Sequence, residues 1–203
     1  VDAALGTDTG GSVRIPASFC DIVGFKPTWG AVSTDGVVEL SYTLDHVGPL
    51  ARDVQTVARV ARTLADGSTT ADFVGPVTDP PALDSLALGV PEQFFGDYLT
   101  ETVERTIMER IDELAAASAT VQEVSIPLFE EAVQTWNAIV NVEFATFLAA
   151  AATPLFRRGR VDASWHRGAA AGIAADGRRF GDVVGRKAVE GKYVARELGA
   201  DPY

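Results

Sequence analysis

Apolar residues in this chain fall into two patterns, short runs and longer stretches with a helical repeat. The short runs are four to six residues long and end at glycine, proline or polar clusters, which is typical of β-strands. One further segment alternates apolar and polar residues. The predicted strands are Val1–Leu5, which reads as the end of a buried strand, Ile22–Phe25, Val37–Leu40, Leu86–Pro91 and the alternating Val121–Ile126.

The longer stretches repeat apolar residues every three or four positions, which places them on one face of a helix. Asp53 and Thr100 stand where N-caps are expected, and Gly67 follows the first long helix. The predicted helices are Val13–Phe19, Val54–Leu64, a helix from Thr100 to about Ala116, Leu128 to about Ala152, Ser164–Ala174 and Phe180–Leu198. Alternation of strands and helices indicates an α/β fold.

Residues 68–84 break both patterns. The segment is rich in Thr, Asp and Pro and contains Pro76, Pro80 and Pro81. Such composition favours a loop over a regular element. We predict a surface linker over 68–84. Elsewhere charged residues interrupt the apolar stretches too often for a membrane span.

Charge and cysteine content narrow the possible partners and compartment. The formal net charge of −11, with 17 Lys and Arg, argues against a nucleic-acid partner. A single cysteine, Cys20, excludes an intrachain disulfide and suits the reducing cytoplasm. Cys20 stands between Phe19 and Ile22, where we expect it to pack as a small hydrophobe rather than act as a nucleophile with His46.

The run from Gly6 to Ala17 is the strongest candidate for chemistry. Two adjacent glycines before Ser12 let the backbone turn sharply and leave its N–H groups accessible to a reacting oxygen. The following helix points its N-terminus toward the same place, which suits developing negative charge. Local sequence leaves two interpretations of Ser12, an N-cap of this helix or a nucleophile.

Two further blocks follow this run, at 19–33 and at 44–54. They read Phe-Cys-Asp-Ile-Val-Gly-Phe-Lys-Pro-Thr-Trp-Gly-Ala-Val-Ser and Leu-Asp-His-Val-Gly-Pro-Leu-Ala-Arg-Asp-Val. Together, and in this order and spacing, the three blocks resemble the amidase signature family, hydrolases built on a Ser–cis-Ser–Lys triad. The resemblance implies an α/β/α sandwich around a large mixed β-sheet, of which this chain supplies a part.

The resemblance also assigns roles to the first block. It implies that Ser12 attacks an amide carbonyl and that the backbone of Thr9, Gly10, Gly11 and Ser12 forms the oxyanion hole. Thr7, Asp8 and Arg14 match the polar residues that support this loop. Asp8 and Arg14 either pair and fix the loop or form an ordinary solvated ion pair. The resemblance implies no metal and no organic cofactor.

The family's lysine base and cis-serine both lie upstream of the nucleophile, yet the eleven residues before Ser12 contain neither Lys nor Ser. We therefore expect residues 1–203 to be a partial amidase signature domain that also lacks the family's C-terminal end. Lys26 is no substitute base, because a lysine before a proline in a turn is usually solvated.

Neither histidine offers a replacement for the missing groups. Adjacent residues on a strand point to opposite faces, so Asp45 is poorly placed to orient His46 in a Ser-His-Asp triad. We expect His46 to be a partly buried polar residue. Neither His46 nor His166 has neighbours at metal-ligand spacing. Trp136 lies at helical spacing with Phe144, which is typical of core residues.

These observations predict an amidase that hydrolyses a small carboxylic amide to the acid and ammonia or an amine through acyl-Ser12. The chain would supply nucleophile and oxyanion hole, and we expect it to be inactive alone. The alternatives are a non-catalytic relative and the amidase subunit of a tRNA-dependent amidotransferase. Ile15 departs from the polar residue usual in those subunits and favours a free-standing amidase. No nucleic-acid or membrane partner is expected.

Overall fold

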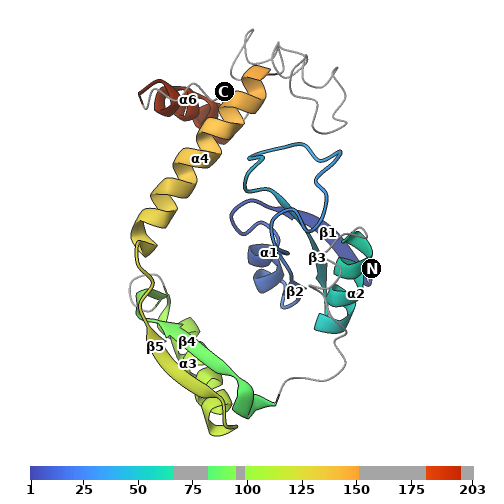
Figure 1. Cartoon of the computed structure of the whole chain (residues 1–203), viewed down its shortest axis with the longest axis vertical. Helices are drawn as coiled ribbons and strands as arrows, with labels where there is room; N and C mark the ends of the chain where they lie inside the picture. The colour runs from blue at the N-terminus through green and yellow to red at the C-terminus, as the bar shows by residue number, and fades with distance from the viewer. Residues whose placement is uncertain (66–81, 95–98, 151–181, 198–203) are drawn as a thin grey trace. The chain divides into compact units, whose positions relative to one another are not determined.

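A computed structural model describes residues 1–65, 82–94, 99–150 and 182–197 (Figure 1). The chain divides into two compact units. The first comprises Val1–Pro76 and Thr135–Tyr203, and the second comprises Val77–Gln134. Helices and strands of both relative directions occur, which gives the α/β character that the sequence predicts.

The first unit contains an antiparallel sheet of order β1-β3-β2, with β1 at Ala3–Asp8, β3 at His46–Ala51 and β2 at Val23–Gly24. Ala3 pairs with Ala51 and Asp8 with His46, which brings the end of β1 beside the start of β3. The predicted strand at Val1–Leu5 is confirmed in part, but Leu5 is 56% exposed and so not buried.

Two departures from the predicted strands have local reasons. The central strand β3 is absent from the predicted strands, although Asp45 and His46 were compared as neighbours on a strand. It contains Pro49, which has no N–H to donate and is rare inside a sheet. The Pro49 carbonyl still accepts from the Phe25 N–H at 3.1 Å. The predicted strand Val37–Leu40 is wrong. The Leu40 N–H donates to a carboxylate, that of Asp45 at 2.8 Å, instead of to a neighbouring strand.

Two helices pack on this sheet. Helix α1 (Arg14–Phe19) contacts β2, and α2 (Val54–Leu64) contacts β3. Asp53 caps α2 as predicted, since its carboxylate accepts from the Thr56 N–H at 2.7 Å. Val13, just before α1, is fully buried. The expectation for Cys20 is wrong, because it stands at the C-cap of α1 with its side chain exposed.

In the later part of the first unit the structure describes two helices, of which the first begins in the second unit. Helix α4 (Phe129–Ala150) and helix α6 (Asp182–Glu197) agree with the predicted helices at 128–152 and 180–198 (Figure 1). They approach closely at Gly191, where a Cβ would overlap the backbone oxygen of Asn141. This close crossing therefore requires glycine at 191.

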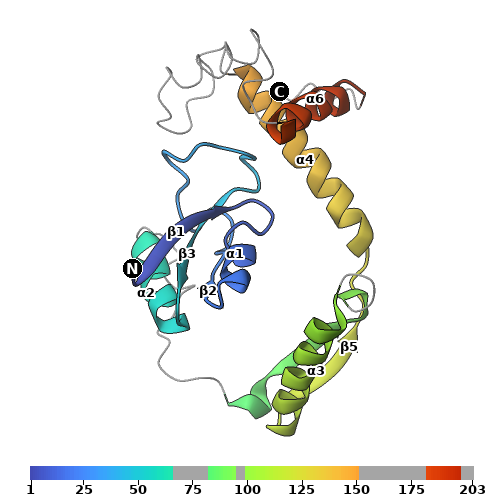
Figure 2. The ribbon, with the colours of Figure 1, turned by 180° about the vertical axis from the view of Figure 1, so that it is seen from behind.

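The second unit is a strand–helix–strand element (Figure 2). Strand β4 (Ala87–Pro91) pairs in parallel with β5 (Thr120–Val124), and α3 (Glu101–Ala116) connects them. Short 3-10 turns, η2 (Leu83–Ser85) and η3 (Glu92–Phe94), flank β4. All three regular elements were predicted. Thr100 is the N-cap of α3, as expected.

Several predictions lie outside the described residues, namely Gly67, most of the linker 68–84, the helix Ser164–Ala174 and His166. Among the helices that the structure describes, none is long and apolar enough to cross a membrane.

Candidate active site

Ser12 lies in the Gly-Gly-Ser loop, residues 9–12, which connects β1 to α1. Its side chain is exposed. The N-cap of α1 is Val13, and no side chain of that residue caps the helix. Within the described part of the chain the Ser12 hydroxyl has no hydrogen bond. The N-cap interpretation of Ser12 is therefore wrong, and the hydroxyl is left accessible.

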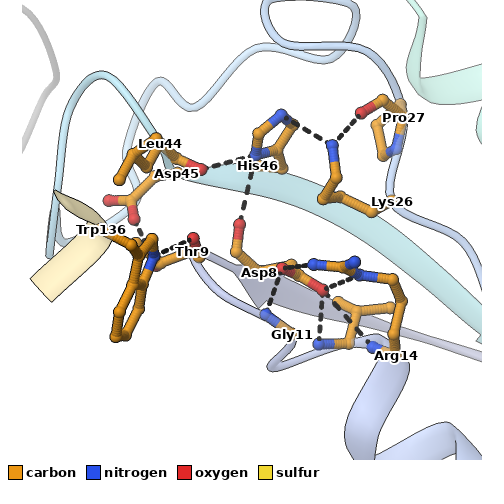
Figure 3. A network of polar contacts seen from close by, with 11 residues as sticks. Asp8, Thr9, Gly11, Arg14, Lys26, Pro27, Leu44, Asp45, His46 and Trp136 are labelled. Carbon is orange, nitrogen blue, oxygen red and sulfur yellow. Dashed lines mark hydrogen bonds and ion pairs between the residues drawn. The ribbon is translucent and has the colours of Figure 1, made fainter. Parts of the chain in front are cut away.

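The carboxylate of Asp8, on β1, caps the N-terminus of α1 in place of Ser12 (Figure 3). Its Oδ1 accepts from the Gly11 N–H at 2.7 Å, and its Oδ2 accepts from the Val13 N–H at 3.2 Å and the Arg14 N–H at 3.4 Å. Arg14 adds two bonds, Nε to Oδ2 and Nη2 to Oδ1, each 3.0 Å long. Asp8 thus joins the last residue of β1 to the first turn of α1 and fixes the loop between them.

The alternative of an ordinary solvated pair is wrong for Asp8, which is fully buried, while the Arg14 side chain is 51% exposed. Burial raises the pKa of the Asp8 carboxyl, but bonds from Arg14 and from the Val13 and Gly11 N–H groups outweigh it and lower this pKa to about 2. The same carboxylate raises the pKa of Arg14. Asp8 is an ionised, fully bonded anchor.

Thr9 is held at two atoms (Figure 3). Its Oγ1 donates to Asp45 Oδ1 at 2.5 Å, and its carbonyl accepts from the indole Nε1–H of Trp136 at 3.0 Å. Asp45 is buried and its other oxygen accepts from the N–H groups of Leu40 at 2.8 Å and Ser41 at 3.0 Å. The residue before Gly10-Gly11-Ser12 is therefore fixed through its side chain and its backbone.

Glu143 of α4 holds residues 41–43, just before Asp45, by hydrogen bonds. Its buried carboxylate accepts from Thr43 Oγ1 at 2.6 Å, from the Thr43 N–H at 3.2 Å and from the Ser41 hydroxyl. The pKa of Glu39 is raised, mainly by burial and further by the negative charges of Asp45 and Glu143. Helix α4 thus supports the Gly-Gly-Ser loop directly through Trp136 and indirectly through Glu143.

The predicted oxyanion-hole residues differ in what their N–H groups contact. The Gly11 N–H already donates to Asp8, and Gly11 has a φ of 130°, a conformation that side chains disfavour. For Gly10 and Ser12 the described residues provide no acceptor. Thr7 lies on β1 opposite Val47 with an exposed side chain, and its supporting role stays a prediction.

Lys26 and His46 form a contact next to Asp8, whose carbonyl oxygen lies 3.3 Å from His46 Nδ1 (Figure 3). Lys26 Nζ donates to the Pro27 carbonyl at 3.0 Å and lies 3.2 Å from His46 Nε2. A lysine ammonium donates hydrogen bonds and accepts none, so His46 Nε2 is the acceptor in this contact. The other ring nitrogen, Nδ1–H, then donates to the Leu44 carbonyl at 2.6 Å. The solvated lysine we expected is thus wrong, since Lys26 is half-buried. His46 is partly buried, as predicted.

Neither Lys26 nor His46 is placed as a base for Ser12, because in the described residues no hydrogen bond joins Ser12 to either side chain. Asp45 bonds to Thr9 rather than to His46, which agrees with our rejection of a Ser-His-Asp triad. The described residues also contain no group of three His, Cys, Asp or Glu side chains placed to hold a metal. A cavity of about 710 Å³ is lined by the first three residues, by Arg52 and Asp53 and by one face of α2, and it includes none of the predicted site residues.

The residues that support the loop from far along the chain were not predicted in that role. Trp136 was predicted as core, and Asp45 was considered solely as a partner of His46. Their contacts with Thr9 span 127 and 36 residues. Helical spacing identifies an inward-facing side chain, but no local signal says which polar group it meets there.

Comparisons with known proteins agree on one family. The Amidase family model matches residues 1–199. The A subunit of glutamyl-tRNA(Gln) amidotransferase from Natronomonas pharaonis is 38% identical over 212 residues, covering 100% of this chain and 49% of that protein. Its counterpart of the same name from Salinibacter ruber is 40% identical over 154 residues, covering 72% and 30%. A crystal structure described as an amidase superposes with a TM-score of 0.72 at 31% identity, covering 98% of this chain and 39% of that one.

The chain thus spans less than half the length of these relatives. The match nevertheless runs through nearly all of its own residues, including β1, the Gly-Gly-Ser loop and α1. The chain belongs to the amidase signature family.

Proposed function

We propose that the intact protein containing this chain hydrolyses a carboxylic amide through an acyl-Ser12 intermediate. The observation that carries the proposal is the exposed Ser12 at the end of a loop that Asp8, Asp45 and Trp136 hold in place through hydrogen bonds to its other residues. A positioned hydroxyl with open space before it is what acyl transfer requires.

In the proposed reaction the Ser12 Oγ attacks the amide carbonyl carbon and gives up its proton. The family resemblance implies that a cis-serine passes this proton to a neutral lysine, both contributed by a segment upstream in the intact protein. The tetrahedral oxyanion collapses, the C–N bond breaks, and the nitrogen leaves with that proton as ammonia or an amine. Water then attacks the ester, which releases the acid and restores Ser12.

We place the oxyanion opposite the N–H groups of the Gly-Gly-Ser loop. Thr9, Gly10 and Ser12 are the proposed donors, since the Gly11 N–H already points at Asp8. Losing one such donor typically costs about a hundredfold or more in rate. The proposed reaction needs no metal or organic cofactor, and we propose the cytoplasm as its compartment.

Substitution Ser12→Ala in the intact protein tests the assignment. We expect it to abolish hydrolysis of a panel of primary amides and p-nitroanilides and to abolish covalent labelling by a fluorophosphonate probe. Ser18→Ala is the matched control, because Ser18 is also exposed and lies further along in α1. Retained labelling or turnover in Ser12→Ala would overturn the nucleophile assignment.

The isolated chain gives a complementary test. Because the implied lysine and cis-serine are not among its residues before Ser12, we expect residues 1–203 alone to show no amide hydrolysis. Robust turnover by this chain would mean that another base activates Ser12. If the intact protein were inactive as well, the alternative of a non-catalytic relative would stand.

A second candidate is the amidase subunit of a tRNA-dependent amidotransferase. It is favoured by the names of the relatives from Natronomonas and Salinibacter, against the weak indication from Ile15. In that case ammonia from glutamine or asparagine would go to a partner subunit, and that partner would contact tRNA, since a chain of net charge −11 is a poor nucleic-acid ligand. Copurification with partner subunits, and glutaminase activity that depends on them, would favour this candidate over a free-standing amidase acting on small amides.

A further inference from the structure

We propose that Trp136 is a positioning residue that aims the Gly10 N–H of the Gly-Gly-Ser loop at the reacting oxygen. The inference rests on the proposed function, and it concerns a residue on α4, far in sequence from Ser12. Its evidence comes from three contacts of one indole ring, with a carbonyl, with a glycine and with a lysine.

The first contact fixes the direction of a peptide unit. The Trp136 Nε1–H donates to the Thr9 carbonyl at 3.0 Å (Figure 3). The Thr9 carbonyl and the Gly10 N–H belong to the same planar trans peptide, in which oxygen and hydrogen point in opposite directions. A bond that holds the oxygen toward α4 therefore holds the Gly10 N–H away from it.

The second contact makes that orientation specific to glycine. A Cβ at position 10 would lie 2.7 Å from Trp136 Cε2 and still closer to its Cζ2. The ring edge thus occupies the space that any side chain at position 10 would need. Ring and peptide are in direct contact as well as hydrogen-bonded, so the peptide cannot tilt toward α4.

The third contact holds the ring itself. Lys187 of α6 places its Nζ 5.5 Å from the ring centroid, and the same Nζ donates to Asn141 Oδ1 at 3.2 Å. Asn141 is buried, and its Nδ2 donates to Glu190 Oε2 at 3.1 Å. A cation over one ring face and a hydrogen bond at its edge leave the indole little freedom to rotate.

The Thr9 side chain completes the restraint. Its Oγ1 bond to Asp45 holds the residue from the side of β3, while Trp136 holds its carbonyl from α4. Without the indole N–H, Thr9 stays in place but its carbonyl loses its donor, and the Thr9–Gly10 peptide is free to rotate. Such rotation removes the Gly10 N–H from the oxyanion while leaving Ser12 intact.

The decisive experiment removes the N–H and keeps the ring. Trp136 is replaced in the intact protein by 3-benzothienylalanine, in which sulfur stands where the indole has N–H. The readout is labelling of Ser12 by a fluorophosphonate, resolved into the maximal rate kinact and the apparent affinity KI. We expect kinact to fall about 10- to 100-fold with KI changed less than about twofold, because the lost donor acts on the transition state. Trp136→Phe should give a similar loss.

The same replacement at Trp29 is the matched control, since Trp29 is 60% exposed, and its kinact should equal that of the unmodified protein. An unchanged kinact in the Trp136 analogue, with Ser12→Ala unlabelled, would overturn the positioning role and leave the proposed function standing. A raised KI with an unchanged kinact would also overturn it, because Trp136 would then contact the ligand. Labelling that persists in Ser12→Ala would instead refute the proposed function itself.

Discussion

The Gly-Gly-Ser loop and the β4–α3–β5 unit are stabilised in opposite ways. In the loop, buried carboxylates and an indole hold Thr9 and Gly11. Asp8 bonds to the nearby Gly11 N–H, while Asp45 and Trp136 reach Thr9 from distant segments. In the second unit the polar contacts of α3 are short-range and exposed, such as Arg110 with Glu113 at 2.7 Å, and α3 contains no buried residue.

This difference predicts which substitutions each region tolerates. Exposed ion pairs one turn apart contribute a few tenths of a kcal/mol, because water and salt screen them. A buried carboxylate with several donors has no such substitute partner, so removing it leaves those donors unsatisfied. We therefore expect substitutions in the loop to affect both stability and reaction rate, and substitutions in α3 to have small local effects.

The largest effect after loss of Ser12 should come from Asp8→Asn. Both Asp8 oxygens accept from a backbone N–H and from Arg14, so either orientation of an amide puts its NH₂ group against donors. We expect a loss of about 2 to 3 kcal/mol in unfolding free energy, measured by urea denaturation, and at least about a hundredfold lower fluorophosphonate labelling rate.

Asp112→Asn is the matched control for this change, since Asp112 is exposed on α3. It should alter the unfolding free energy by less than about 0.5 kcal/mol. If Asp8→Asn and Asp112→Asn were equally stable, the buried hydrogen bonds of Asp8 would not explain a different sensitivity of the two regions to substitution.

The pH dependence of stability gives a second, smaller test. The pKa of Asp8 is lowered to about 2 from an ordinary value of 3.8, so its contribution is fully present above about pH 5 and is lost as the pH falls through about 2. That contribution is about 2 kcal/mol. The difference in unfolding free energy between the unmodified protein and Asp8→Asn should therefore shrink between about pH 5 and pH 2. A difference that stays constant would mean that Asp8 is not ionised in the folded state.

The smallest expected effect is in α3. Thr100→Ala removes the bond from the Val103 N–H, whose length of 3.5 Å is already long, and should cost about 0.5 to 1 kcal/mol. This loss of helix stability should appear as faster hydrogen exchange than in the unmodified protein, measured on the peptide that covers residues 101–116. Thr102→Ala, an exposed position inside the same helix, should leave exchange unchanged or slower, since Ala is the better helix former. Equal exchange in both variants would argue against a capping role for Thr100.

Sequence predictions were most accurate where neighbouring residues decide the outcome. Asp53 and Thr100 cap their helices as predicted, and β4, α3 and β5 lie where the apolar patterns placed them. Strand β3, which contains Pro49, was not among the predicted strands, and the prediction for 37–40 failed because the Leu40 N–H donates to Asp45. Cys20 was expected to be buried because its neighbours are apolar, but it is exposed at a helix end.

By itself the sequence determined the strand–helix order, the family and the position of Ser12 between two glycines and a short helix. These depend on local spacing and on motifs, which are readable residue by residue. Tertiary structure alone decided that Asp8 caps α1, that Asp45 and Trp136 hold Thr9, and that Lys26 pairs with His46. The reason is physical, since hydrogen bonds depend on which groups the folded chain brings within about 3 Å, and that proximity leaves no trace in the spacing of residues 36 or 127 positions apart.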